Sequence, residues 1–351
     1  MTASQPAPRR DSALDALRMI AVLLMIASHS SRLIVWEQRR GWSRFSLLIE
    51  PLTASLFLIL VGASLAHSWR AARAGGRGPW YRRQAMRAAA LWAVSVVFYS
   101  LEDGFRLPDA LTMSGILATI AYTSLLGMLL VSAPRPAIGL CLAAAAMIGL
   151  HAWLDSRGMQ LFVLNAGNSP LLPLTLFALL GALGVHAVDS GWKVKAPVLA
   201  AAAASLAYIL SRHGFSEVFS KPMGRYETIR TLGPAWGPGS ARAEIPYYNL
   251  RPILVPMIAS LIVFLYAGLA LLRPWLDKSG RWLLAMGRRS LDVYILHLSL
   301  LAVLVVTGGK RPITASWHGD AMILIVIAVC WVWVLGRDRW AARRRAAAAN
   351  A

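Results

Sequence analysis

The sequence is poor in cysteine, in charged side chains and above all in acidic residues. Of its 351 residues only 2 are cysteine, 15% are charged and 16 are acidic, against 36 lysines and arginines. Both cysteines lie in apolar stretches, so nothing indicates a disulfide framework or a metal cluster. An ordinary soluble domain, with about 25% charged residues, is excluded by so low a charge content.

Several catalytic motifs are also missing. The chain has no Walker-type phosphate loop, no His-Glu-x-x-His and no Gly-x-Ser-x-Gly. The sequence therefore gives no sign of a P-loop nucleotidase, a zinc protease or a serine hydrolase, and no metal is expected.

Long apolar runs dominate what is present. Hydrophobic residues make up 57% of the chain, which includes 14 tryptophans, and the mean hydropathy is +0.55. We predict an all-α polytopic membrane protein, one integral domain over 1–351 with flexible cytoplasmic tails at 1–12 and 338–351. About ten transmembrane helices are expected, near 14–35, 46–69, 86–101, 111–132, 136–154, 171–189, 196–211, 250–273, 285–306 and 320–336.

The net charge of +20 is distributed unevenly between alternate loops. With the N-terminus inside, most basic residues fall on cytoplasmic segments and most acidic residues on outside segments. This predicts N-in and C-in topology, with the longest outside loop, 211–249, between spans seven and eight. The basic excess then reflects topology and contact with the lipid bilayer, and no nucleic acid partner is expected.

The first span carries three ionisable residues, Asp15, Arg18 and His29, which are costly in hydrocarbon. Arg18 and His29 are separated by about 20° around a helix and about 16 Å along it, so they share one stripe. Asp15 and Arg18 could be interfacial anchors, and His29 could be a hydrogen-bonded packing residue. The alternative is that this stripe carries chemistry.

The motif Leu14-Asp15-Ala16-Leu17-Arg18, followed by His29, resembles the first helix of transmembrane acyltransferases. That superfamily includes the acyltransferase-3 family and the heparan-alpha-glucosaminide N-acetyltransferase-like family. The second span lacks the Gly-Val-Asp-x-Phe-Phe pattern of acyltransferase-3 proteins, which favours the glucosaminide branch.

A second motif opens the ninth span as Gly-x-x-Ser-x-x-x-Tyr-x-x-His, with Gly287, Ser290, Tyr294 and His297. Ser290, Tyr294 and His297 have i, i+4, i+7 spacing and so line one helix face. This motif also resembles a late helix of both families. His297 could contact substrate, or it could tie two helices together through a hydrogen bond.

The resemblance implies an enzyme that takes an acyl group, most simply acetyl, from cytoplasmic acyl-CoA (acetyl-CoA). The acceptor would be a hydroxyl or amino group of a glycan or amino sugar at the outer face of a bacterial inner membrane. An imidazole can act as base or carry the acyl group, and we assign that role to His29. Arg18 could meet the acyl-CoA or pair with Asp15.

Arginines gather in segments expected to face the cytoplasm. A guanidinium can hold a phosphate through bidentate hydrogen bonds, although a plain positive-inside loop has the same composition. Arg70 to Arg73 has the Arg-x-x-Arg spacing associated with acyl-CoA in acyltransferase-3 proteins. The candidates for donor binding are Arg70, Arg73, Arg82, Arg83, Arg87, Arg288 and Arg289.

Acceptor contacts are expected on the outside and along the ninth span, where carboxylates, amides and aromatic rings could bind a sugar. Each candidate also has a plainer interpretation, as a wet loop, a helix cap or an interfacial anchor. The candidates are Glu102, Asp103, Asn168, Trp236, Tyr294 and His297.

Two other functions remain open from the sequence. A transporter or flippase of a lipid-linked or charged solute could use Arg18 and His29 as a relay without covalent chemistry. A scaffold could have kept the fold and lost catalysis. The sequence leaves open the oligomeric state, with a homodimer as one option, and does not name the acceptor.

Overall fold

The structure of the protein is a computed structural model of the whole chain. It describes residues 11–31, 50–103, 105, 107–112, 114–159, 161, 163–165, 169–189, 192–213, 225–230, 244–249, 254–279, 282–308 and 316–349.

Helices account for nearly all of the described residues. They are α1 (Ser12–Ser31), α3 (Glu50–Gly75), α4 (Arg77–Asp103), α5 (Asp109–Thr112), α6 (Ile116–Val131), α7 (Pro136–Ser156), α8 (Leu171–Asp189), α9 (Trp192–His213), α11 (Leu254–Leu271), α12 (Arg273–Ser279), α13 (Ala285–Arg288), α14 (Ser290–Gly308) and α15 (Ser316–Ala349).

Each predicted span overlaps at least one of these helices, but the fourth, 111–132, is divided between α5 and α6 and the ninth, 285–306, between α13 and α14. Among the described residues, α1, α3, α7, α8, α9 and α15 contain stretches long and apolar enough to cross a membrane, and α6, α11 and α14 are shorter apolar helices. The helical membrane class is therefore confirmed, whereas ten crossings and the N-in, C-in orientation stay predictions.

The outside loop predicted over 211–249 contains two strands that we did not predict. Strands β1 (Arg225–Arg230) and β2 (Glu244–Asn249) pair antiparallel, with Arg225 opposite Asn249 and Arg230 opposite Glu244. Tyrosine and isoleucine occur in both strands, and β1 also has a threonine; these residues favour extended backbone. An all-α description therefore holds for the apolar part of the chain and not for this hairpin.

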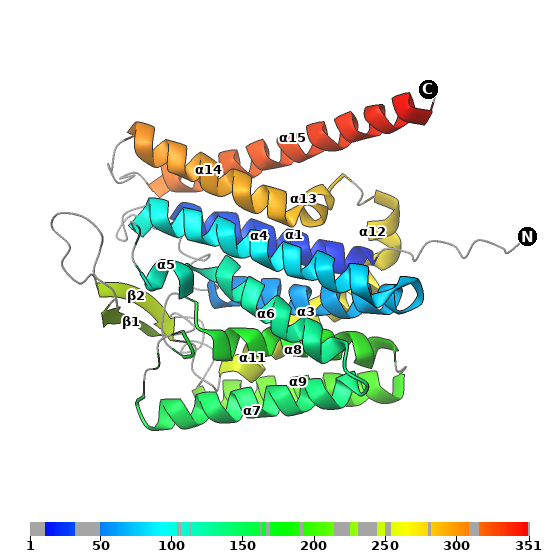
Figure 1. The fold of residues 1–351 in the computed structure, drawn as a ribbon, viewed down its shortest axis with the longest axis vertical. Helices are drawn as coiled ribbons and strands as arrows, with labels where there is room; N and C mark the ends of the chain where they lie inside the picture. Colours follow the sequence, from blue (N-terminus) through cyan, green and yellow to red (C-terminus); the bar gives the residue numbers. More distant parts are fainter. Residues whose placement is uncertain are drawn as a thin grey trace, which may run out of the picture. The chain divides into compact units, whose positions relative to one another are not determined.

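The chain divides into two compact units. Unit 1 comprises Met1–Thr53 and Phe264–Ala351, and unit 2 comprises Ala54–Val263. In unit 1, α1 contacts α12, α13, α14 and α15, and these are the blue, yellow, orange and red helices of Figure 1. Helix α1 is thus the element around which unit 1 packs.

Helix α1 begins with a side-chain cap. Asp11 Oδ1 accepts hydrogen bonds from the backbone amides of Ala13 and Leu14, at 3.0 and 3.4 Å, which satisfies donors that a helix start leaves unpaired. Its other oxygen accepts from Arg273 at 2.8 Å and from Tyr266 at 3.3 Å. Asp11 therefore ties the start of α1 to α11 and to the first residue of α12.

In unit 2, α3 and α8 pack backbone to backbone. A Cβ at Gly62 would collide with the carbonyl of Ala178, and a Cβ at Gly181 would collide with the carbonyl of Ile59. Glycine at both positions therefore lets the two helices approach this closely.

Buried hydroxyls join α4, α6 and α8. Ser95 Oγ on α4 donates to the Ser114 carbonyl at 2.5 Å and accepts from the Ala118 amide at 3.2 Å. Because α6 has no side-chain cap of its own, Ser95 serves that purpose. Thr123 and Thr175 join α6 to α8 through a hydroxyl pair at 2.7 Å.

Helix α15 continues through most of the predicted C-terminal tail. Its 34 residues correspond to about 51 Å at 1.5 Å per residue, longer than the roughly 30 Å hydrocarbon core of a bilayer. Its last turns are alanine and arginine, which favour helix. Arg344 stacks over the Trp340 ring at 4.1 Å. The other predicted tail, 1–12, lies almost wholly outside the described residues.

Candidate active site

The buried carboxylate of α1 is paired within its own helix. Arg18 Nη1 donates to Asp15 Oδ1 at 2.6 Å, and Asp15 is only 3% exposed. Burying one charged group without a partner of opposite charge is costly, and Arg18 supplies that partner here. Of the two roles left open for Arg18, the structure shows the pairing with Asp15.

Gly287 brings the two sequence motifs together. It is buried in α13, and a Cβ added there would collide with the carbonyl of Asp15 and the amide nitrogen of Met19. Only a residue without a side chain lets the two backbones come this close. The glycine that opens the second motif therefore lies against the first motif.

The two histidines of these motifs meet further along the helices. His29 Nδ1 and His297 Nε2 are 2.9 Å apart, their ring planes differ by 14° and the ring centroids are separated by 5.1 Å. His297 is fully buried, and its Nδ1 lies 3.0 Å from the carbonyl oxygen of Val293. An imidazole on α1 and one on α14 thus form a hydrogen-bonded pair, hereafter the imidazole pair.

Tyr294 lies edge-on to both rings of the imidazole pair. Its ring centroid is 6.3 Å from that of His29 and 5.4 Å from that of His297, with interplanar angles of 81° and 83°. Tyr294 and His297 therefore share a face of α14, as their spacing predicted, and that face meets α1. For His297 the observed contact is the helix-to-helix tie that we raised as one alternative.

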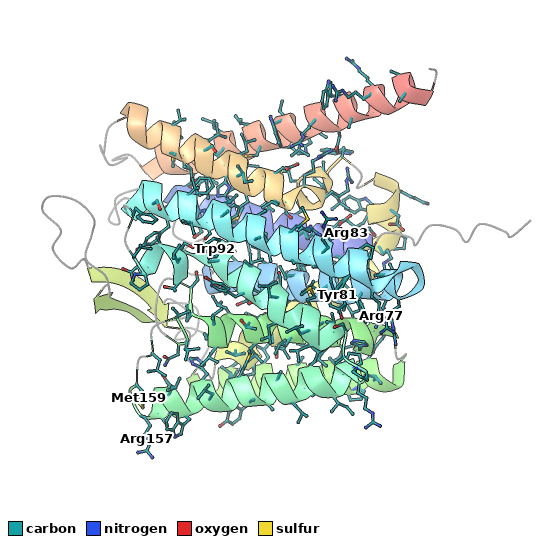
Figure 2. All side chains as sticks on the ribbon, in the orientation of Figure 1. Arg77, Tyr81, Arg83, Trp92, Arg157 and Met159 are labelled. Atoms are coloured by element: carbon teal, nitrogen blue, oxygen red, sulfur yellow. The ribbon has the colours of Figure 1, made fainter. Side chains whose placement is uncertain are left out.

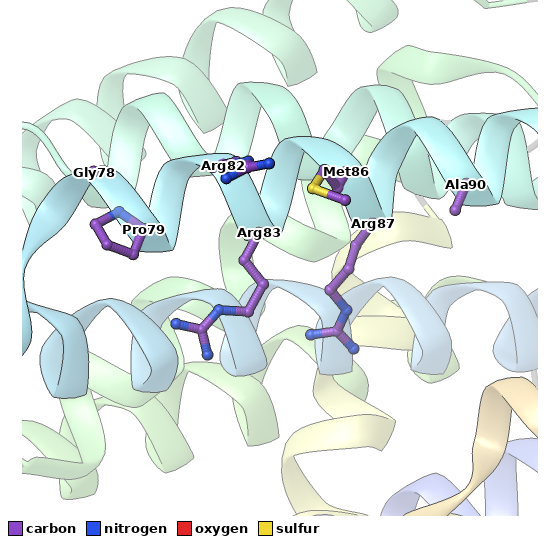
Figure 3. A pocket seen from close by; sticks show the side chains of 7 residues that line it. All are labelled: Gly78, Pro79, Arg82, Arg83, Met86, Arg87 and Ala90. Carbon is purple, nitrogen blue, oxygen red and sulfur yellow. The ribbon is translucent and has the colours of Figure 1, made fainter.

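Three of the predicted donor-binding arginines line an open groove on α4. The groove has a volume of about 730 Å³ and is lined by Gly78, Pro79, Arg82, Arg83, Met86, Arg87 and Ala90. Arg83 and Arg87 lie one turn apart and extend in the same direction (Figure 3), as i and i+4 residues do. Two parallel guanidinium groups over one groove can hold a phosphate.

The other two donor-binding candidates in unit 2, Arg70 and Arg73, lie toward the end of α3. Arg70 Nη2 is 3.2 Å from His186 Nδ1 on α8. Since a guanidinium only donates, this nitrogen of His186 accepts. Arg73 is exposed. Arg70 therefore has a partner that sequence reasoning did not identify.

An aromatic cluster joins α3 to the start of α4 and was also missed. Trp69, Trp80 and Tyr81 have ring centroids 4.9 to 5.9 Å apart, and the Arg77 guanidinium lies 5.9 Å from the Trp69 ring. Figure 2 shows Arg77 and Tyr81 at one end of unit 2 and Trp92 toward the other. The sequence feature that could have indicated this cluster is the pair of runs Trp-Arg and Trp-Tyr-Arg-Arg, one on each side of the junction between α3 and α4.

Arg288 and Arg289 belong to an ion-pair network with α15. Arg289 donates to Asp338 at 2.7 Å and to Asp292 at 3.3 Å, while Arg288 lies 3.7 Å from Asp338. Arg337 also pairs with Asp292 at 3.1 Å. These arginines tie α13 and α14 to α15.

The structure does not describe the side chains of the predicted acceptor contacts outside α14. Glu102 and Asp103 are the last residues of α4, where side chains are not described. Asn168 and Trp236 lie outside the described residues. Within the described part of the chain, no group of three or more His, Cys, Asp or Glu side chains is placed to hold a metal ion.

These features define a helical integral membrane protein whose first helix carries a buried ion pair and one half of an imidazole pair. The chain belongs to the family of heparan-alpha-glucosaminide N-acetyltransferase catalytic domains, whose family model matches residues 10–217. A comparison with curated proteins gives no match.

The family match confirms the resemblance seen in the first span and favours the glucosaminide branch over acyltransferase-3. It makes the chain a transferase of the acetyltransferase type, from a family that modifies glycans and in general uses acetyl-CoA. The matched range contains α1 with Asp15, Arg18 and His29, and it ends before α14.

Proposed function

We propose that the chain moves an acetyl group from cytoplasmic acetyl-CoA to a hydroxyl or amino group of a glycan or amino sugar at the outer face. Both termini would lie in the cytoplasm of a bacterial cell. The observation that carries the proposal is the imidazole pair, because His29 lies on the helix that the family model covers. Imidazoles in membrane helices are costly and indicate function; here His297 is fully buried and His29 half-buried.

His29 supplies the reactive nitrogen. In a direct transfer, the acceptor oxygen or nitrogen bonds to the acyl carbon, its proton moves to His29, and the carbon–sulfur bond breaks. The imidazolium then returns the proton to the coenzyme A thiolate, which leaves His29 neutral for the next cycle. In a two-step transfer, the same nitrogen attacks the thioester, the carbon–sulfur bond breaks and the coenzyme A thiolate leaves. The acceptor oxygen or nitrogen then bonds to the acetyl carbon, the bond from that carbon to His29 breaks, and the acceptor's proton passes to the thiolate.

Arginines of the α4 groove are the donor-binding candidates that the geometry favours. Arg82, Arg83 and Arg87 are exposed along one groove, whereas Arg288 and Arg289 pair with carboxylates of the same unit. Replacing Arg83 and Arg87 together by glutamine is expected to raise the KM for acetyl-CoA and leave the acceptor KM unchanged.

The matched control is the double replacement of Arg288 and Arg289 by glutamine. It removes the same charge, and we expect it to lower stability without changing the acetyl-CoA KM. An acetyl-CoA KM that rises equally in both double variants would mean that the α4 groove has no special part in binding.

The function is tested with purified protein in lipid nanodiscs and acetyl-CoA labelled in the acetyl group. We expect slow thioester hydrolysis alone, and label in the sugar when glucosamine-terminated oligosaccharides are added. A transporter would move solute across proteoliposomes and leave the label on coenzyme A. Absence of both hydrolysis and transfer, with a folded protein, would contradict the proposal.

A further inference from the structure

The residue that completes the imidazole pair lies outside the part of the chain that the family model covers. His297 is on α14, whereas the match ends at residue 217. It is fully buried, and its two ring nitrogens lie within hydrogen-bond distance of His29 and of the Val293 carbonyl. A completely buried imidazole with a partner at each nitrogen has its tautomer fixed by those partners.

The Val293 carbonyl determines the tautomers of both histidines, because it ends the chain of hydrogen bonds that joins them. The Val293 oxygen can only accept, so Nδ1 of His297, 3.0 Å away, carries a proton. In neutral His297 the other nitrogen, Nε2, then carries a lone pair and accepts from Nδ1 of His29 at 2.9 Å. His29 consequently has its proton on Nδ1 and its lone pair on Nε2.

We propose that His297 is a positioning residue that holds His29 in the Nδ1–H tautomer and so makes Nε2 of His29 the reactive atom. The inference rests on the acetyl transfer proposed above. Without a partner at Nδ1, a neutral histidine prefers its proton on Nε2. The Nε2 atom then has no lone pair with which to take a proton or attack a thioester. His297 accepts from Nδ1–H of His29, as the aspartate of a catalytic triad accepts from Nδ1–H of its histidine and so fixes the tautomer of the base.

The same hydrogen bond supports the charged state of His29. When Nε2 takes the proton of the acceptor, the acceptor's O–H or N–H bond breaks and an N–H bond forms on His29. The Nδ1–H bond to His297 is then charge-assisted and stronger. His297 needs neither to gain nor to lose a proton in the cycle.

Two substitutions separate positioning from packing. His297→Gln can accept from His29 through its amide oxygen and donate to Val293 through its NH₂ group. His297→Phe fills a similar volume and does neither. We expect kcat to fall by about 10- to 100-fold in the Phe variant, the usual cost of losing an orienting partner, with KM unchanged. The Gln variant should retain most of the kcat.

Leu301→Ala is the matched control on the same helix. Leu301 is 6% exposed, so the change opens a buried space in α14 without touching the hydrogen-bonded chain. We expect lower thermal stability and unchanged kcat. If all three variants lose kcat in proportion to their loss of stability, His297 only packs α14 and the proposal is overturned.

A readout independent of catalysis is the ¹⁵N NMR spectrum of histidine-labelled protein in nanodiscs, with the His29 signals assigned by their loss in His29→Gln. We expect a protonated Nδ1 and an unprotonated Nε2 for His29 at neutral pH, and the reverse in His297→Phe. A proton on Nε2 in the wild type overturns the proposal, whether or not the protein transfers acetyl groups. Should the wild type prove inactive, the acetyl-transfer proposal fails and the NMR spectrum still decides the tautomer.

Discussion

Gly287→Ala tests whether the two motifs are held together by direct backbone contact. The new methyl group would collide with the carbonyl of Asp15 and the amide nitrogen of Met19, neither of which can move without shifting α1. Overpacking of this kind costs about 1–3 kcal/mol. Alanine in a helix recovers about 0.5–1 kcal/mol of conformational entropy relative to glycine, so the net effect should be destabilising.

Gly336→Ala in α15 is the matched control, because a Cβ there meets no atom within 4 Å. It should gain the same helix stability without the collision. We expect the two variants to shift the midpoint of SDS-induced unfolding in opposite directions, and Gly287→Ala also to lose acetyl transfer as α1 and α14 separate. Equal unfolding midpoints and activities for the two variants would refute the close contact between α13 and α1.

Three further outcomes are expected. Thr123→Val should lower the free energy of unfolding by about 1–3 kcal/mol, because it leaves the buried Thr175 hydroxyl without its partner on α6. Replacing both threonines by valine should lower it less, and unfolding in SDS measures both variants. Asp338→Asn should lower stability by no more than about 1 kcal/mol, since the pair is partly exposed, with the acetyl-CoA KM unchanged in steady-state kinetics. A membrane-impermeant thiol reagent added outside should label Cys at position 237 and not at position 77; the reverse would contradict the predicted topology.

The sequence predicted the helices because each span is a long apolar run, which length and hydropathy identify without tertiary information. Helical periodicity also predicted that Arg18 and His29 share one face, because they lie only 11 positions apart on the same helix. The strands of the 211–249 excursion were missed because six-residue segments between glycines and prolines give little periodic signal.

The pairing of functional groups could not be predicted in the same way. His29 and His297 are 268 positions apart, and only the packing of α1 against α14 brings them together. Arg289 and Asp338 are 49 positions apart. Two neighbouring arginines therefore suggested phosphate binding, although Asp338 of α15 pairs with both of them. Spacing identifies a face of a helix, and the fold decides what that face meets.

The most direct test of the central claim is acetyl transfer by His29→Gln, measured beside the wild type with the same labelled donor and acceptor. Glutamine keeps a side chain that can donate to His297 but cannot take a proton or carry an acetyl group. We predict a folded protein whose transfer rate is lower by about 10²- to 10⁴-fold, the usual contribution of a positioned base. A folded His29→Gln variant with near wild-type turnover would contradict the account, because His29 would then be a packing residue.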